Sequence, residues 1–245
     1  MAHIATSLYP DIPLVFSNTG LEHPHIISHV RTHENVVQIR PKTPFNKVIE
    51  KYGWPVISKS IAMAVSRARN TKSSDVKDYR LNGRIVDGKK QIAGTIPKKW
   101  HFLMDTPFAI SEQCCNHLKK FPFKKYEKES GRKPMIATMI SDSGVRAADL
   151  NKRGCNVYDT GHPQSRPMAK WNEEDVWRYL RENNIKYCRL YDEGEKRTGC
   201  VFCMFGIMHD KDRFIRLKIS SPVQYNYVIN TLGGDKVLDY LGIKY

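Results

Sequence analysis

Four of the six cysteines fall into two close pairs, and these pairs carry the strongest chemical signal in the sequence. Cys200 and Cys203 form a Cys-Val-Phe-Cys motif, whose spacing lets both sulfurs reach one metal centre from a single turn. By itself this motif fits a redox dithiol, half of a zinc site or half of an iron–sulfur site. Cys114 and Cys115, far upstream, supply the other half of a four-thiolate set.

The adjacency of Cys114 and Cys115 bears on which metal centre this set would hold. Neighbouring residues on a helix do not face the same way, so two such thiols converge poorly on one tetrahedral zinc ion. An iron–sulfur cluster accepts ligands at separate corners, and the pattern therefore favours [4Fe–4S], with zinc as the alternative. Four buried, inert thiols are a further alternative. Cys155 and Cys188 stand alone and are expected to be packing residues.

Short apolar runs that alternate with helical patterns must position these thiols. The alternation predicts an α/β fold with a Rossmann-like parallel sheet and flanking helices. Strands are expected at 14–17, 36–39 and 135–140, and helices at 24–34, 44–52, 59–69, 111–120 and 122–130.

The rest of the chain divides into a basic loop and a helical end. Residues 70–97 are polar, basic and rich in glycine, which predicts a mobile loop. Asn172 is expected to cap a helix, with Asp175 in the capping-box position, and Ser221 to begin another. The predicted domains are a nucleotide-binding-like α/β domain at 1–165, containing this loop, and a helical cluster-binding region at 166–245 packed on it.

Composition and charge limit the classes of function. The 245 residues are 27% charged and contain no apolar run near the roughly 20 residues that a membrane span needs. No signal peptide is visible, so we expect a cytoplasmic protein with reduced thiols. The net charge of +15 suggests an anionic partner such as nucleic acid, a nucleotide or an acidic protein. The excess is concentrated at 67–99 and 119–133, and a basic surface that only aids solubility is the alternative.

Four stretches together carry a family resemblance. Residues 15–22, Val-Phe-Ser-Asn-Thr-Gly-Leu-Glu, look like a strand and Thr-Gly turn at a nucleotide site, and residues 114–119 look like a double-cysteine and lysine motif. Residues 137–146 resemble a loop that holds a phosphosulfate, and residues 167–177 with 197–203 resemble a C-terminal half. The chain thus resembles the phosphoadenosine phosphosulfate (PAPS) reductase family, in the iron–sulfur-containing, adenylylsulfate-reductase-like branch of the adenine-nucleotide α-hydrolase-like superfamily.

The resemblance implies a PAPS reductase or sulfotransferase-like enzyme of sulfur metabolism. It would act in sulfonucleotide reduction or ATP-dependent sulfur transfer and bind an adenine or phosphosulfate nucleotide. Gly20 would let the backbone approach that nucleotide, and Lys119 would lie beside both cluster and anion. The expected nucleotide- and substrate-binding residues are Thr19, Gly20, Lys59, Lys119, Ser143, Arg146 and Arg197, and the expected cluster ligands are Cys114, Cys115, Cys200 and Cys203.

The sequence also departs from the family pattern. The Ser-Gly-Gly-Lys-Asp-Ser phosphate loop (PP-loop) is not found, so we expect the first strand and its loop to be absent. A partner chain or a dimer contact is then expected at the edge beside residues 14–17. No cysteine follows Cys203, where the family has a nucleophile, and Gly144 stands where arginine is frequent. The alternative function is therefore a non-catalytic, cluster-bearing protein that binds nucleic acid or regulates a partner.

Overall fold

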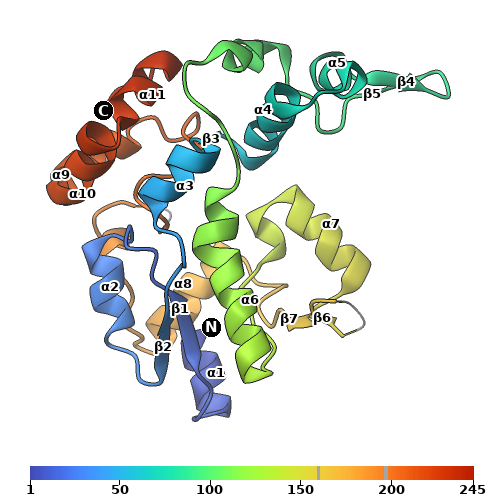
Figure 1. Cartoon of the computed structure of the whole chain (residues 1–245). Coiled ribbons are helices and arrows are strands. Elements are labelled where there is room, and N and C mark those ends of the chain that lie inside the picture. Colours follow the sequence, from blue (N-terminus) through green and yellow to red (C-terminus); the bar gives the residue numbers. More distant parts are fainter. Residues whose placement is uncertain (159–160, 196–197) are drawn as a thin grey trace. The chain divides into compact units, whose positions relative to one another are not determined.

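The chain is organised as two compact units whose sequence segments are interleaved. The computed structural model describes residues 1–158, 161–195 and 198–245 (Figure 1). Unit 1 comprises Met1–Phe16, His25–Ile39 and Phe123–Arg197, whereas unit 2 comprises Ser17–Pro24, Arg40–Pro122 and Thr198–Tyr245. The domain boundary expected after residue 165 stays a prediction. Within the described ranges, no helix combines the length and apolar character needed to cross a membrane.

Unit 2 is built around an apolar core that joins its distant segments. Phe45 and Phe202 lie in this core with their ring centroids 3.6 Å apart, and Leu103 and Phe214 are fully buried. The elements of unit 2 are α3 (Phe45–Tyr52), β3 (Val56–Ile57), α4 (Lys59–Asn70), α5 (Ser74–Asn82), β4 (Arg84–Val86), β5 (Lys89–Gln91), the 3₁₀ helix η1 (Lys98–Asp105), the π-helix η2 (Asn116–Lys120), β8 (Met204–Phe205), α9 (Arg213–Ser220), α10 (Pro222–Asn226), the π-helix η5 (Tyr227–Thr231) and α11 (Gly234–Leu241).

Local sequence signals explain where α3 and α4 begin and end. The Ser58 hydroxyl accepts a hydrogen bond from the Ile61 N–H at 3.2 Å, which caps the start of α4. Gly53 ends α3 with φ of 102°, and a Cβ there would lie 2.2 Å from the Ala109 backbone. Only glycine fits this close approach. The predicted helices at 44–52 and 59–69 are confirmed to within one residue.

The strands of the described residues pair two by two. In unit 2, β3 and β8 run parallel, with Val56 opposite Met204, and β4 and β5 form an antiparallel hairpin. In unit 1, β1 pairs with β2, and β6 pairs antiparallel with β7. The α/β class is confirmed. The strand expected at 135–140 is wrong: Met135 makes only an isolated bridge, and Ile140 opens a 3₁₀ turn.

The predicted mobile loop at 70–97 is also wrong, because this segment contains a helix and a hairpin. Ser73 caps α5 through its hydroxyl, which accepts from the Val76 N–H at 3.3 Å. Asp87 and Gly88 both have positive φ, at 50° and 73°, and connect β4 to β5 in a two-residue turn. An Asp-Gly pair is among the strongest hairpin signals in a sequence. The glycines therefore mark element ends rather than disorder.

Unit 1 is mostly helical. Its buried side chains include Leu150, Val157 and Leu190, and the Arg166 guanidinium is buried against the Asp149 carboxylate at 2.7 Å. The elements that lie in it wholly or mainly are α1 (Ala2–Leu8), β1 (Leu14–Ser17), α2 (Pro24–Val30), β2 (Val36–Ile39), α6 (Phe121–Ser130), the 3₁₀ helix η3 (Ile140–Asp142), α7 (Gly144–Arg153), β6 (Asn156–Val157), β7 (Gln164–Ser165), α8 (Glu173–Glu182) and the 3₁₀ helix η4 (Arg189–Tyr191).

The expected capping box at the start of α8 is confirmed. The Asn172 side chain accepts from the Asp175 N–H at 3.0 Å, and the Asp175 carboxylate accepts from the Asn172 N–H at 3.1 Å. We expect Asn172→Ala to lower the free energy of unfolding by about 1 kcal/mol, since one cap hydrogen bond is lost. Thermal unfolding checks this, with Asn151→Ala as the control because Asn151 is exposed on α7 and caps nothing. An equal loss in both variants would contradict the assignment.

Candidate functional site

Both cysteine pairs lie in unit 2 and converge on one place. Cys114 and Cys115 precede the π-helix η2, and Cys200 and Cys203 lie in the loop that leads into β8. Electrostatic interactions join Cys114 to Cys200 and Cys203, and Cys203 to Cys115. All four are free thiols; Cys114 is buried and the other three are partly buried. The structure thus gathers the four thiols that the sequence paired.

The expectation that the neighbouring thiols Cys114 and Cys115 diverge is wrong. Their Sγ atoms lie 3.9 Å apart, and the Cys114 thiol donates to Cys115. This shared hydrogen bond raises the pKa of Cys114 and lowers that of Cys115. The two residues immediately precede the π-helix η2, and their side chains point toward each other. Their adjacency therefore does not by itself exclude zinc.

The arrangement is not that of a closed site for a single ion. Among the described residues, no three His, Cys, Asp or Glu side chains are grouped closely enough to hold one metal ion. A tetrahedral zinc ion with Zn–S distances of about 2.3 Å would place all four sulfurs about 3.8 Å from one another. The 3.9 Å separation of the Cys114 and Cys115 sulfurs matches that spacing, but among the described residues no third ligating side chain joins them closely enough to hold one ion.

Lys119 lies on η2 and interacts with Cys115 and Cys200. Burial alone would lower the pKa of Lys119, but negative charge on Cys200, with Glu22 and Cys115, raises it above its ordinary value. Lys119 also forms a hydrogen bond with the Cys200 sulfur. Burial raises the pKa of the Cys200 thiol to about 11, and the lysine opposes that shift. The ammonium is therefore held charged at the centre of the site.

Two further cations surround the thiols. Lys59, the exposed first residue of α4, acts with Lys119 to lower the pKa of Cys115, an effect that adds to the Cys114 hydrogen bond. Arg213, at the start of α9, lowers the pKa of Cys203, which burial otherwise raises, and donates to the Cys200 carbonyl at 3.0 Å. Lys59 was expected at the site from the sequence. Arg213 was missed because nothing in its local sequence links it to the cysteines.

The Thr19–Gly20 turn is fixed by a buried carboxylate. Glu22 accepts hydrogen bonds from the Thr19 N–H at 2.9 Å and the Thr19 hydroxyl at 2.7 Å. Glu22 and Thr19 are both buried, whereas Gly20 is exposed with φ of 82°. Glu22 belongs to the sequence motif at 15–22, but its role in holding Thr19 follows only from the structure. The Thr-x-x-Glu spacing is that of a capping box and would have indicated the bond from the Thr19 N–H to Glu22, but the Thr19 hydroxyl accepts from the Leu21 N–H at 3.3 Å rather than from the Glu22 N–H.

The same turn is tied directly to the second cysteine pair. Glu22 and Cys200 form an isolated antiparallel bridge, and the Val201 N–H donates to the Leu21 carbonyl at 3.0 Å. The Gln224 side chain donates to the Glu22 carbonyl at 2.6 Å. Negative charge on Glu22 also acts on both Lys119 and Cys200. The Thr19–Gly20 turn and the thiol site are therefore parts of one connected structure within unit 2.

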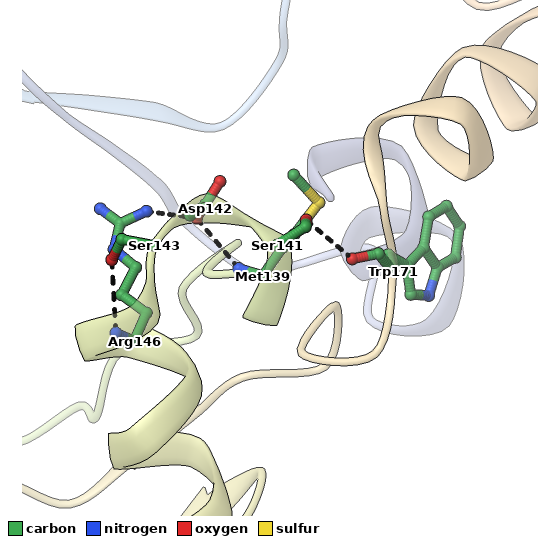
Figure 2. Close-up of polar contacts among 6 residues, drawn as sticks. All are labelled: Met139, Ser141, Asp142, Ser143, Arg146 and Trp171. Carbon is green, nitrogen blue, oxygen red and sulfur yellow. Dashed lines mark hydrogen bonds and ion pairs between the residues drawn. The ribbon is translucent and has the colours of Figure 1, made fainter.

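Ser143 and Arg146 belong to unit 1, at the start of α7 (Figure 2). The Ser143 hydroxyl accepts from the Arg146 N–H at 3.3 Å and caps the helix. The Arg146 guanidinium forms an ion pair with the Asp142 carboxylate, which also accepts from the Met139 N–H at 3.1 Å. Ser143 thus has a structural task, and Arg146 would have to exchange its carboxylate partner for a substrate anion.

The remaining expected site residue, Arg197, lies outside the described residues. Cys155 and Cys188 belong to unit 1. Cys188 is buried and Cys155 is partly buried, which agrees with the packing role expected of them. Around the thiol site of unit 2, the described structure thus brings together Thr19, Gly20, Lys59, Lys119, Cys114, Cys115, Cys200 and Cys203 from the expected set, and adds Glu22 and Arg213.

Comparison with known proteins gives the family. The phosphoadenosine phosphosulfate reductase domain matches residues 1–205, so the chain belongs to this family. An adenosine 5'-phosphosulfate reductase of Allochromatium vinosum is 26% identical over 101 residues, which is 41% of this chain and 38% of that protein. An uncharacterized protein of Methanocaldococcus jannaschii is 32% identical over 164 residues, covering 64% of this chain and 36% of the relative.

Among solved structures, a phosphoadenylyl-sulfate (PAPS) reductase from Candida auris in a phosphate complex is 16% identical, with a TM-score of 0.42. That alignment covers 80% of this chain and 72% of the other. The chain matches well under half the length of the two curated relatives described above.

Proposed function

We propose that the chain binds an adenine sulfonucleotide and reduces its phosphosulfate to sulfite as part of sulfur metabolism. The observation that carries this proposal is the position of Lys119: in a chain of the PAPS reductase family, a charged ammonium lies between four converging thiols and the Glu22-braced Thr19–Gly20 turn. The turn offers exposed backbone to the nucleotide, and the ammonium offers a point charge to the sulfate end.

The thiol set fits a [4Fe–4S] cluster held by Cys114, Cys115, Cys200 and Cys203. Four cysteine thiolates are the ligands that such a cluster takes. The donors converge but are not gathered around the position of a single ion, and cations at Lys59, Lys119 and Arg213 offset their negative charge. When bound, the cluster supplies a redox-active cross-link between the two cysteine pairs. Zinc is the alternative occupant.

The protein residues would act on the substrate mainly through charge. Lys119 would pair with the sulfonate, whose charge is retained as the bond to the phosphate breaks. Lys59 is exposed at the start of α4, acts electrostatically on Cys115 and would add a second positive charge for the same anion. Burial around the thiols reduces competition from water and strengthens such pairing.

The reaction balances with an external dithiol as the reductant. One thiolate of the dithiol attacks the sulfur, an S–S bond forms, and the bond from sulfur to the bridging oxygen breaks to release the nucleotide. The second thiolate then attacks the first thiol sulfur, which releases sulfite and leaves the donor as a disulfide. The sulfur gains two electrons and the dithiol loses two. No cysteine beyond the four proposed ligands is required of this chain.

Isothermal titration with adenosine 5'-phosphosulfate tests the proposed role of Lys119. We expect Lys119→Ala to weaken binding by about 10- to 100-fold, the value of a hydrogen bond to a charged group in a buried site. AMP lacks the sulfonate, so the Lys119→Ala substitution should weaken the binding of AMP less than the binding of adenosine 5'-phosphosulfate. The matched control is Lys211→Ala, an exposed lysine of the same unit. Unchanged affinity for the phosphosulfate, with iron content retained, would contradict the proposal.

A further inference from the structure

A basic arm projects from unit 2 and takes no part in the thiol site. We define the arm as residues 71–95, which contain α5 and the β4–β5 hairpin. Figure 1 shows the hairpin at the end of α5, extending away from α4. The arm lies inside the stretch 67–99, which holds ten Lys or Arg residues and three Asp or Glu residues. A net charge of +7 on 33 residues, out of +15 for the whole chain, calls for a physical explanation.

Part of this charge has a structural task. Arg69 donates to the Thr106 hydroxyl at 2.7 Å and to the Phe108 carbonyl at 2.8 Å, which anchors the end of α4. Arg80 donates to the Gly94 carbonyl at 2.6 Å and closes the base of the arm. Arg84 lies over the Tyr79 ring at 5.2 Å. These three arginines hold the arm in shape.

The lysines of the arm have no such task. Lys72, Lys77, Lys89 and Lys90 are exposed, and their ammonium groups form no ion pair or hydrogen bond with another described residue. A salt-bridged surface would pair lysines with nearby carboxylates. Here the ammonium groups stay available to an outside anion. Four unpaired cations on one projecting element form a multivalent site for a polyanion.

The hairpin adds an apolar face to this charge. Ile85 is paired with Lys90 in the register, so both side chains lie on one face of the ribbon, and Ile92 continues that face from β5. Ile85 is 76% exposed and Ile92 63% exposed. Two large aliphatic side chains exposed on one face of a hairpin offer apolar surface that a partner can cover. The partner must therefore offer both negative charge and apolar surface.

We propose that the arm binds duplex DNA. A two-stranded ribbon fits the major groove of B-form DNA, where apolar side chains can contact the methyl group of thymine. The exposed lysines would contact phosphates on either side of the groove, where they release counterions. Double-stranded RNA presents a deep, narrow major groove and should bind more weakly. This inference rests on the arm alone and is independent of the proposed sulfonucleotide chemistry.

Fluorescence anisotropy with a fluorescein-labelled 20-base-pair DNA duplex, at several salt concentrations, tests the proposal. We expect Lys89→Ala/Lys90→Ala to reduce the slope of log K against log salt by about 1.8, since each lost phosphate contact removes about 0.9. Affinity at 0.1 M salt should fall at least about tenfold. Ile85→Ser should weaken binding and leave the slope unchanged, because the isoleucine contact is not ionic.

The matched control is Lys211→Ala/Lys244→Ala, which removes two exposed lysines of the same unit outside the arm. The proposal predicts little effect of this control on affinity or slope. It would be overturned if the wild-type chain failed to bind the duplex, or if the control lost as much affinity as the arm variant. Displacement of the duplex by poly-glutamate at equal charge would also overturn it and indicate an acidic protein partner. A labelled RNA duplex of the same sequence distinguishes the two nucleic acids.

Discussion

Cys200→Ala is expected to abolish iron binding and to lower thermal stability. Anaerobically purified wild-type chain should contain about four iron and four sulfide per molecule if a [4Fe–4S] cluster occupies the site. Cys200 forms a hydrogen bond with Lys119 and a backbone bridge with Glu22. Its replacement by alanine leaves three of the four proposed cluster ligands. Metal-binding free energy is partly folding free energy. A loss of even 3 kcal/mol would lower the midpoint of unfolding by about 6–12 °C.

The control for this experiment is Cys155→Ala, which also removes one thiol. Cys155 belongs to unit 1 and is only partly buried, so iron and sulfide should be retained. Stoichiometric zinc without sulfide in the wild-type chain would contradict the cluster and leave a zinc site. Full iron and sulfide in Cys200→Ala would contradict the ligand assignment itself.

Glu22→Ala is expected to impair both the fold of unit 2 and nucleotide binding. The substitution removes the carboxylate that holds the Thr19 N–H and hydroxyl and leaves the N–H without its acceptor. It also takes away one of the negative charges that keep Lys119 protonated. Two hydrogen bonds to a buried charged group correspond to about 3 kcal/mol of unfolding free energy. The freed turn should weaken binding of adenosine 5'-phosphosulfate by at least about tenfold.

Urea unfolding and isothermal titration measure these two effects separately. Glu50→Ala is the matched control, because Glu50 is exposed on α3 and its carboxylate pairs, within the described part of the chain, with Lys47 alone at 2.8 Å. The control should change the free energy of unfolding by less than about 1 kcal/mol. Destabilisation of Glu22→Ala with unchanged nucleotide affinity would show that the turn is structural only. No destabilisation would contradict the role of the carboxylate.

Helices could be predicted from the sequence where a capping residue and an apolar helix face indicate the same segment. At α4, the helix predicted at 59–69 differs by one residue from the observed helix, which a serine caps and whose buried residues are small or apolar. At α8, the capping box fixes the start of the helix whatever packs against it. Such signals are local and need no knowledge of distant segments.

The elements that depend on distant partners were harder to predict. Residues 135–140 have the apolar character of a strand, but only Met135 finds a bridge partner, at Ser165. The arm was mistaken for a loop because its helix and hairpin bury little apolar surface, so hydrophobic periodicity gave no signal. The Asp87–Gly88 turn was the local feature that indicated it.

The thiol site was predicted in its residues but not in its geometry. Pairing of cysteines along the chain identified the four thiols, and the family motif added Lys119. The sequence could not reveal that Cys114 and Cys115 meet at 3.9 Å, because side-chain rotamers at the entry to a π-helix decide that distance. Nor could it place Arg213, which reaches the Cys200 carbonyl only through tertiary packing.

The interleaving of the two units has a consequence for how the protein is made. In unit 2, β3 ends at Ile57 and pairs with β8, which ends at Phe205. At about 5–20 residues per second, a ribosome needs roughly 7–30 s to synthesise the intervening chain. During this interval the nascent β3 has no partner strand, and Cys114 and Cys115 emerge before Cys200 and Cys203 exist. If the proposed cluster occupies the site, its insertion would follow the synthesis of Cys200 and Cys203, and the early thiols would stay without a complete ligand set until then.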